Sequence, residues 1–390
     1  MCKKDYSIAC LLRSIHLLLS RTAAALVLIC ATSVFTQTAV AGSTFTPTGS
    51  MATAHVYTAA TLLSNGQVLI AGGRNNNGVI SGAELYNPAN GTFAPTGDLL
   101  VARYAATATL LPNGQVLVAG GFDSADHVLD SCELYSPASG IFSSIGSLIS
   151  GRAFATATML NNGRVLLAGG FGKFGTTLAT GEIYDPSTSN FAPTGNMPTA
   201  TAYASATLLA NGEVLIAGGS LSGVNLVQAQ RYNSISNTFT ATGTMTAGRR
   251  QTVASLLPNG KVLIAGGFGN DNIPLASTEL FDPASGAFVA SNDMITARQN
   301  ATATLSGGQV LIVGGGSGAG YISGAERYDP ATGKFASNGN LKTARWLSTA
   351  TLLPNGKVLI ATGVGSDGYL NSAEIYDPAG DTLLSDGFDG

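Results

Sequence analysis

The sequence predicts an all-β protein built from one repeated unit, and three observations lead to this prediction. The first is composition: 50 of the 390 residues are glycine, 45% are hydrophobic and only 11% are charged. A disordered chain would carry more charge, a collagen would have glycine at every third position, and a long-helix protein would avoid a residue that costs about 1 kcal/mol per helical site. The other two observations are a repeat of nearly fifty residues and the turn signals within each copy.

Residues 1–41 differ from the rest of the chain and are typical of a secretory signal peptide. A basic leader comes before an apolar run from Ala23 to Phe35, and Ala39-Val40-Ala41 supplies small residues for cleavage. The run is shorter than the ~20 residues of a transmembrane helix, although an uncleaved anchor that also uses residues 17–19 stays an alternative. A lipid on Cys30 is disfavoured because the bulky Ile29 precedes it.

Cleavage after Ala41 leaves 15 basic and 21 acidic residues, a net charge near −6. We therefore expect no nucleic-acid partner, because such a partner needs a basic surface. Cleavage also leaves Cys132 as the single cysteine, so no disulfide can form within the mature chain. No later stretch could span a membrane. The expectation is a secreted protein, extracellular or periplasmic and monomeric, without a cofactor.

Four features recur in phase from residue 43 onward. Asn-Gly pairs recur every 48 or 49 residues, with Gly307-Gly308 in the one gap, and a Gly-Gly pair begins six residues after each turn glycine. Two aromatic residues follow, seven residues apart. The asparagines are Asn65, Asn113, Asn162, Asn211, Asn259 and Asn355. The Gly-Gly pairs begin at Gly72, Gly120, Gly169, Gly218, Gly266 and Gly314, and Thr362 takes this place in the last copy. The first aromatics are Tyr86, Tyr135, Tyr184, Tyr232, Phe281, Tyr328 and Tyr376; the second are Phe93, Phe142, Phe191, Phe239, Phe288 and Phe335, and Leu383 ends the series.

Each unit reads as four short strands, and the second unit illustrates them. Residues 105–111 form a small-residue strand, 115–119 an apolar strand, 132–135 a third strand and 141–144 a fourth. Asn113-Gly114 joins the first two strands, and this pair favours a type I′ turn because both of its residues tolerate positive φ. Pro137 lacks an N–H and therefore ends the third strand.

Seven units imply seven blades arranged in a ring. We expect a signal peptide at 1–41, a propeller at 42–384 and a tail at 385–390. The units are 51–98, 99–147, 148–196, 197–244, 245–293, 294–340 and 341–384. The ring must close, because an open edge invites aggregation. Residues 43–49 match the fourth-strand segment 91–97, so we expect the N-terminal strand to close the last blade, with residues 381–387 as the alternative.

The repeat length, the Gly-Gly pair and the phased aromatics resemble the Kelch β-propeller family over about residues 43–390. The family usually has Trp at the second aromatic position, where this chain has Phe. Its one Trp, Trp346, is expected on an inner strand.

Antiparallel alternation predicts two different faces. The Asn-Gly and Pro-containing turns lie on one, here called the turn face. The loops after Gly-Gly and the links between units lie on the other, the variable face, where sequence differs between copies and binding is usually encoded. Each link ends in a residue expected near the axis. These residues are Arg103, Arg152, Arg249, Arg298 and Arg345, with His55 and Thr201 in the other two units.

The arginines have two interpretations. They could form a guanidinium ring around a central pocket, suited to a carboxylate or a sugar acid, or they could be structural, tying down loop carbonyls. Further ligand-binding candidates come from the variable loops. They are Arg74, Asp123, Asp126, His127, Asp271, Tyr321, Asp367 and Tyr369. Asp123, Asp126, His127 and Asp130 could hold a cation, although they lack the glycine and glutamate of a known calcium loop, and a solvated loop is the preferred interpretation. The apolar loop of unit four (Leu221, Val224 and Leu226) is interpreted as packing.

Three functions are considered. The leading hypothesis is a secreted interaction module that binds an extracellular glycan or protein on the variable face. The alternative is a carbohydrate-active enzyme, similar to a sugar-acid mutarotase or epimerase, that uses the arginine ring. The third is a purely structural surface protein. The resemblance extends to the propeller of galactose oxidase, whose copper chemistry needs a Tyr–Cys cross-link, a second Tyr and two His. His55 and His127 lie in neighbouring units and Cys132 begins a third strand, so we expect no copper site, no other metal and no catalytic residues. The recurrent glutamates of the third strands (Glu84, Glu133, Glu182, Glu279, Glu326 and Glu374) are expected to be structural.

Overall fold

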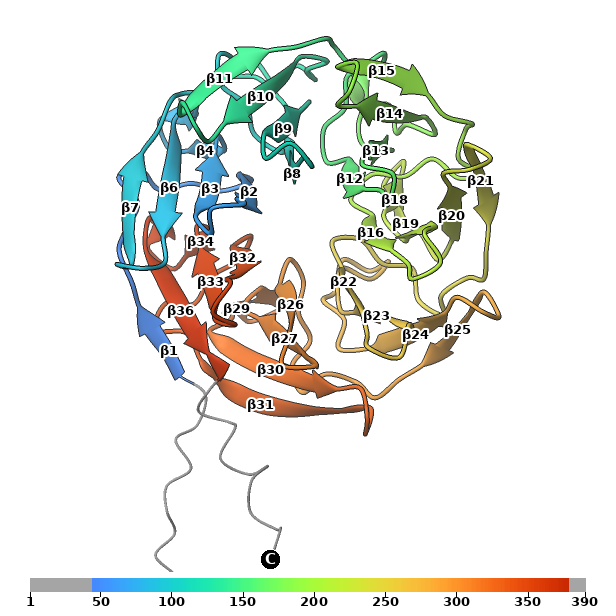
Figure 1. Cartoon of the computed structure of the whole chain (residues 1–390). Helices are drawn as coiled ribbons and strands as arrows, with labels where there is room; N and C mark the ends of the chain where they lie inside the picture. Colours follow the sequence, from blue (N-terminus) through green and yellow to red (C-terminus); the bar gives the residue numbers. More distant parts are fainter. Residues whose placement is uncertain (1–43, 379–390) are drawn as a thin grey trace, which may run out of the picture. The chain divides into compact units, whose positions relative to one another are not determined.

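A computed structural model describes residues 44–378 of the chain; the expected signal peptide and C-terminal tail lie outside the described residues. Seven four-stranded antiparallel sheets surround a common axis (Figure 1). The predicted all-β, seven-bladed architecture is confirmed. Within residues 44–378 there is no α-helix; a 3-10 turn lies at Lys173–Gly175, and no helix there is long and apolar enough to cross a membrane.

The innermost strands line the axis, and each contacts the innermost strand of the blade on either side, so the ring is continuous. They are β2 (Ala59–Leu62), β8 (Thr107–Leu110), β12 (Thr156–Met159), β16 (Ser205–Leu208), β22 (Val253–Leu256), β26 (Thr302–Ser306) and β32 (Thr349–Leu352). Each pairs with a second strand. Over the seven second strands every residue except Gln309 is buried, because blades pack on both faces of each strand. The second strands are β3 (Val68–Ala71), β9 (Val116–Ala119), β13 (Val165–Ala168), β17 (Val214–Ala217), β23 (Val262–Ala265), β27 (Gln309–Val313) and β33 (Val358–Ala361).

The third and outer strands complete each blade. The third strands are β6 (Ala83–Asn87), β10 (Cys132–Ser136), β14 (Gly181–Asp185), β20 (Ala229–Asn233), β24 (Thr278–Asp282), β30 (Gly324–Asp329) and β36 (Ala373–Asp377). The outer strands are β7 (Thr92–Pro95), β11 (Ile141–Ser144), β15 (Asn190–Pro193), β21 (Thr238–Ala241), β25 (Ala287–Ala290), β31 (Lys334–Asn340) and β1 (Thr44–Pro47). Strand β1 pairs antiparallel with β36, with Phe45 opposite Tyr376, so the N-terminal strand closes blade 7 as predicted.

The Asn-Gly turns differ from the prediction. Gly66 has φ 83° but Asn65 is not among the residues with positive φ, and the Gly66 N–H donates to Leu63 O. This is a three-residue hairpin with glycine in the left-handed position, so the predicted type I′ turn is wrong here. Where Gly307-Gly308 replaces Asn-Gly, both residues have positive φ and Ser306 pairs with Gln309, as a two-residue type I′ turn requires. The asparagine side chain explains the difference, because Asn65 Oδ1 accepts the Gln67 N–H and braces the longer loop.

Glycine is required at the Gly-Gly pairs because the backbone has positive φ there and because the space is too small for a side chain. The second glycine has φ between 92° and 104° in every blade. A Cβ on Gly170 would lie 2.6 Å from Ala153 O, in the link of the same blade, so no side chain fits.

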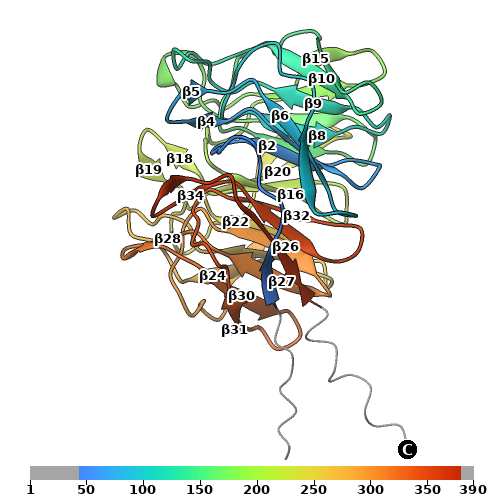
Figure 2. The ribbon, with the colours of Figure 1, turned by 90° about the vertical axis from the view of Figure 1, so that its left-hand side faces the viewer.

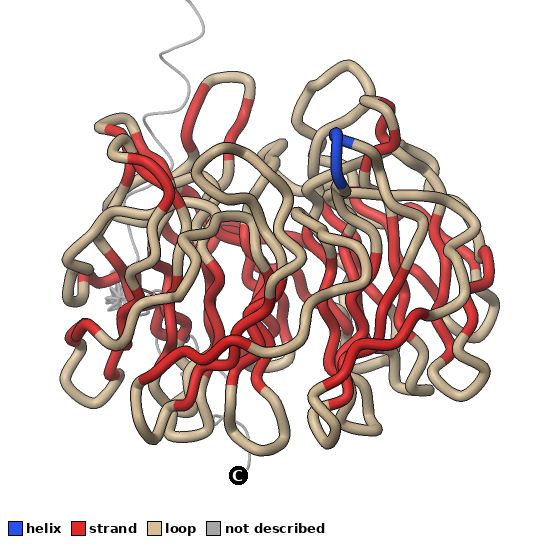
Figure 3. The backbone as a smooth tube through the Cα atoms, turned by 90° about the horizontal axis from the view of Figure 1, so that it is seen from above, coloured by secondary structure: helices blue, strands red, loops and turns tan. Residues whose placement is uncertain are grey.

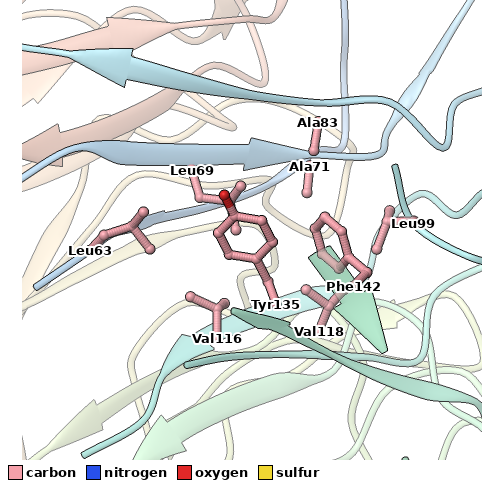
Figure 4. Close-up of a cluster of buried hydrophobic side chains, with 9 residues drawn as sticks. All are labelled: Leu63, Leu69, Ala71, Ala83, Leu99, Val116, Val118, Tyr135 and Phe142. Carbon is pink, nitrogen blue, oxygen red and sulfur yellow. The ribbon is translucent and has the colours of Figure 1, made fainter. Parts of the chain in front are cut away.

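The hydrophobic core lies between the blades. Each of seven clusters joins the second strand of one blade to that of the next, capped by the recurrent aromatic pair. In Figure 4 the cluster between blades 1 and 2 places Tyr135 and Phe142 beside Leu69, Val116 and Val118. The phased aromatics are therefore packing residues, as their recurrence indicates.

Short hairpins follow Gly-Gly in blades 1, 4, 6 and 7, and all lie on one side of the ring (Figure 2). Figure 3 shows the 3-10 turn of blade 3 on the same side as raised loops. The hairpins are β4–β5 (Arg74–Asn75 and Gly78–Val79), β18–β19 (Ser220–Leu221 and Val224–Asn225), β28–β29 (Gly316–Ser317 and Gly320–Tyr321) and β34–β35 (Val364–Gly365 and Gly368–Tyr369). The variable face thus carries the short hairpins and the 3-10 turn, which differ from blade to blade.

Candidate ligand-binding site at the axial mouth

The five link arginines are buried, and protein acceptors hold their guanidinium groups. Their exposed fractions are between 0 and 2%. Arg152 is representative: Nη1 donates to Gly169 O (2.8 Å) and Thr180 O (3.1 Å), and Nη2 donates to Glu182 Oε1 (2.6 Å). Burial lowers the pKa of Arg249, Arg298 and Arg345, whereas the paired glutamates raise it.

Each arginine pairs with the glutamate on the third strand of its own blade. The ion pairs are Arg103–Glu133, Arg152–Glu182, Arg249–Glu279, Arg298–Glu326 and Arg345–Glu374. The glutamates also accept backbone N–H groups of the link, as Glu182 does from Ile149 (2.7 Å) and Ser150 (3.0 Å).

Two units lack the arginine: blade 4 replaces both partners, and blade 1 has a histidine in place of the arginine. In blade 4, Thr201 and Gln230 replace arginine and glutamate together, and Thr201 Oγ1 still donates to Gly218 O at 2.8 Å. In blade 1, His55 Nε2 lies 3.7 Å from Glu84 Oε1. Where the glutamate is kept, a basic or ionisable side chain, Arg or His, lies beside it, and where it is lost in blade 4 the arginine is lost too, so the pair is a structural unit.

A cavity of about 340 Å³ lies among the innermost strands, and none of the link arginines lines it. Its walls are small residues: Ala60, Val253, Ala254, Ala301, Thr302, Ala303, Ser348, Thr349, Ala350 and Thr351. The geometry favours the structural interpretation of the arginines over a guanidinium ring around a pocket.

The axial mouth on the variable face is instead formed by seven residues just before the innermost strands. All have φ between 47° and 59°, a region that non-glycine residues rarely adopt. In six of the seven steps around the axis, the N–H of one of these residues donates to the carbonyl of its counterpart in the preceding blade, at 2.9 to 3.4 Å. This axial ring consists of Tyr57, Ala105, Phe154, Tyr203, Gln251, Asn300 and Leu347. The backbone is the same in every blade, so the ring's side chains carry what is specific to this protein.

Aromatic side chains dominate the ring in blades 1 to 4. Phe154 lies at the centre, with its ring centroid 5.3 Å from Tyr57 and 4.4 Å from Tyr203. Phe122 lies 6.0 Å from Phe154 and stacks on Tyr104 at 5.2 Å. The six rings in mutual contact, here the axial aromatic cluster, are Tyr57, Tyr104, Phe122, Phe154, Phe171 and Tyr203.

Burial raises the pKa of all three tyrosines of this cluster. Burial raises the pKa of Tyr203 to about 12, and Tyr57 adds to the shift while Arg250 opposes it. Burial and a 2.6 Å hydrogen bond to Asp126 raise the pKa of Tyr104 to about 12. The hydroxyls of this cluster are therefore neutral donors and acceptors at physiological pH.

A hollow of about 370 Å³ opens beside the cluster, between the loops of blades 2 and 3. Phe122 and Val128 contribute apolar surface, and Phe174 is fully exposed at its rim. Two predicted site residues, Asp126 and His127, also line it, together with Lys173 and Gly175.

The loop considered as a possible cation site uses its carboxylate in hydrogen bonds within the loop. Asp123 Oδ1 accepts the N–H groups of Ala125 and His127, and His127 Nδ1 lies 3.3 Å from Asp123 Oδ2. Backbone hydrogen bonds, chiefly from His127, hold the pKa of Asp123 below its usual range. Among residues 44–378 no three His, Cys, Asp or Glu side chains converge.

A copper centre of the galactose oxidase kind does not fit these residues. His55 is buried and its Nδ1 contacts Gly72 O, whereas the His127 side chain is 77% exposed on an outer loop. Cys132 is buried between blades, where desolvation raises its pKa to about 12. The three side chains lie in three separate environments.

Other predicted residues lie around the rim of the variable face. Arg74 lies over the ring of Tyr104 at 5.0 Å. Tyr321 is 42% exposed and its ring is 6.4 Å from Trp346, which lies just before β32 and not on an inner strand as predicted. Tyr369 is on β35, and it adds to the rise that burial causes in the pKa of Tyr57. Asp271 and Asp367 are on exposed loop tips and are not drawn into the cluster.

The central residues of the site were missed at the sequence level. Tyr57, Phe154 and Tyr203 each lie two residues after a link residue, which is His55, Arg152 or Thr201, and Arg250 directly follows Arg249. The signal in the sequence is that the position two residues after each link residue is aromatic in three units and varied elsewhere.

Comparison with known proteins now identifies the repeat. A Kelch motif model matches residues 297–337, which span most of blade 6. The chain is a seven-bladed β-propeller with a Kelch motif in its sixth blade. No curated protein matches this Kelch propeller in sequence.

Solved structures share its fold. A copper-bound fungal alcohol oxidase of the AA5 family is 18% identical with a TM-score of 0.71, covering 86% of this chain and 76% of that one. The structure of YjhT is 15% identical with a TM-score of 0.59, covering 74% of this chain and 99% of that one. At these identities the likeness of the Kelch propeller to both structures concerns the fold.

Proposed function

We propose that the Kelch propeller is a secreted binding module that takes a glycan at the axial mouth of its variable face. The axial aromatic cluster carries this proposal. Sugar rings present a C–H face that packs on aromatic rings and hydroxyl edges that need polar partners, and the partly buried Tyr57 and Tyr203 offer both.

The surroundings of the cluster have the composition of a binding site. The neighbouring hollow is within the usual size range of ligand pockets, about 300–1,000 Å³, and combines apolar walls with a few polar groups. On the opposite side of the mouth, Asn300 Nδ2 donates to Gln251 Oε1 at 3.2 Å, so amide groups face the aromatic half.

Exposed apolar side chains also concentrate on this face. Most of the large exposed hydrophobic residues lie in its loops or links, which leaves apolar surface on this face for a partner. They are Leu100, Val101, Ile149, Phe174, Val224, Ile273, Ile295 and Tyr321. The signal peptide expected at residues 1–41 supports a role outside the cytoplasm.

A rival hollow lies on the turn face and supplies matched controls. It measures about 350 Å³, between blades 3 and 4, and is lined by Arg164 and by Ile235, which is 96% exposed. A ligand there would contact turn residues that recur from blade to blade and would not contact the axial aromatic cluster.

The test is a glycan array followed by calorimetric titration of the best binder. Phe154→Ala and Tyr203→Ala should each weaken binding at least tenfold, about 1.4 kcal/mol, because each removes a central ring. Ile235→Ala should leave affinity unchanged, and circular dichroism should show that all variants fold. Binding that survives both ring substitutions would contradict the site, a protein ligand in place of any glycan would contradict the ligand class, and turnover of the bound sugar would replace a binding module with an enzyme.

A further inference from the structure

Two arginines at the axial mouth differ from the buried link arginines in their partners. Within residues 44–378, Arg74 and Arg250 form no ion pair with a carboxylate, whereas each link arginine has its glutamate. Both are partly exposed and both lie against aromatic rings, Arg74 over Tyr104 at 5.0 Å and Arg250 over Phe268 at 4.7 Å.

Arg250 is held in place by neutral groups. Its Nη1 donates to Asn225 Oδ1 at 2.7 Å and its Nη2 donates to Asn272 Oδ1 at 3.1 Å. Asn225 is 4% exposed and its amide donates to Phe268 O, so its orientation is fixed by blade 5. A guanidinium has five N–H donors, and the amides take two of them without neutralising its charge. The group is therefore oriented in advance with donors to spare.

The charges near the mouth favour an anion. Arg74 opposes the rise that burial causes in the pKa of Tyr57, and Arg250 does the same for Tyr203, so each cation lies near one of these hydroxyls. On the Arg74 side, Asp126 accepts the Tyr104 hydroxyl at 2.6 Å. The loop carboxylate of blade 5, Asp271, forms no ion pair with Arg250 within the described part of the chain.

We infer that the axial mouth recognises an acidic saccharide, whose sugar ring packs on Tyr57, Phe154 and Tyr203 and whose anionic group binds Arg250, with Arg74 as a second anchor. This inference rests on the proposed glycan-binding function and adds the charge of the ligand. Arginine is suited to the task because its planar fork matches a carboxylate or sulfate through two hydrogen bonds.

The test uses matched pairs of saccharides that differ only in charge: galacturonate oligomers and their methyl esters, and a sulfated glycan and its desulfated form. The full chain should bind the acidic member at least tenfold more tightly, and added salt should reduce this preference because ions screen exposed charges. Arg250→Gln should weaken binding of the acid roughly ten- to hundredfold and leave the neutral member nearly unchanged. Arg74→Gln should have a smaller effect in the same direction, and it keeps the test valid if Arg250→Gln fails to fold. Arg164→Gln removes the same charge from the turn face and should have no effect.

The outcomes separate the two proposals. Equal binding of acidic and neutral members would overturn the acidic ligand while leaving glycan binding intact. An acid preference that persists in both Arg250→Gln and Arg74→Gln would overturn the assignment of these anchors. Failure of every saccharide to bind would overturn the proposed function and this inference with it.

Discussion

Exchange of the Arg152–Glu182 pair for the Thr–Gln pair of blade 4 tests the structural role of the link arginines. The variants are Arg152→Thr, Glu182→Gln and the double substitution. Both native side chains are at most 2% exposed, and the ion pair is 2.6 Å long. Blade 4 shows that the double exchange is compatible with the fold.

The structure gives the expected magnitudes. Arg152→Thr leaves a buried carboxylate with only its amide donors, and Glu182→Gln leaves a buried guanidinium without its counter-charge, each costing about 3–5 kcal/mol. In the double variant a threonine hydroxyl can reach Gly169 O, as Thr201 reaches Gly218 O at 2.8 Å. The remaining loss is the hydrogen bond to Thr180 O and some unfilled volume, about 2–4 kcal/mol. The double variant should therefore be more stable than the sum of the singles predicts, by about 2 kcal/mol or more.

The assay is chemical unfolding followed by circular dichroism, with the free energies compared in a double-mutant cycle. Additive costs, or a cost below about 1 kcal/mol for Arg152→Thr, would refute the reasoning and reopen the possibility that the arginine is held for a ligand.

Three further predictions concern single residues. Cys132 should resist a thiol reagent at about pH 8 in the cleaved, folded chain and react on unfolding, because the thiol is buried and its pKa is raised to about 12; rapid native reaction would contradict this burial. Burial raises the pKa of Glu84, but the neighbouring His55 and hydrogen bonds from the Ala52 and Thr53 N–H groups outweigh it and lower the pKa overall. This stabilisation is complete above the unfolded pKa of about 4.3 and is lost as pH falls through the folded value. Glu84→Gln should accordingly lose less stability than the wild type between about pH 5 and pH 3, and an identical acid profile would count against the assignment. Gly170→Ala should lower the denaturation midpoint more than Gly175→Ala, since both have positive φ but only the Gly170 Cβ would meet a backbone oxygen, at 2.6 Å; equal effects would show that φ alone matters.

The fold was predictable because the repeat carries it. Packing between blades imposes the same demands seven times, so the second strands, the Gly-Gly pairs and the aromatic pairs recur in phase and are visible in one sequence. The turn type was not, because a two-residue turn and a three-residue turn can share Asn-Gly, and the choice depends on which residues pair across the hairpin.

The candidate site was predictable only in part. The variable face and the hollow around Asp126 and His127 follow from loop sequence, but the aromatic cluster joins Tyr57, Phe154 and Tyr203 from three blades, and such convergence depends on curvature around the axis. The link arginines allowed two interpretations for the opposite reason: a recurrent charge is compatible with a ring of ligands, whereas recurrence in phase with Glu182 and its equivalents is what a buried ion pair produces.

The account's central claim is that ligand binds at the aromatic mouth, and hydroxyl-radical footprinting with the best-binding acidic saccharide tests it most directly. Bound ligand should protect Tyr57, Phe154 and Tyr203 from oxidation and leave Ile235 on the turn face unprotected. Protection confined to the turn face, or unchanged oxidation of the three rings at saturating ligand, would contradict the account.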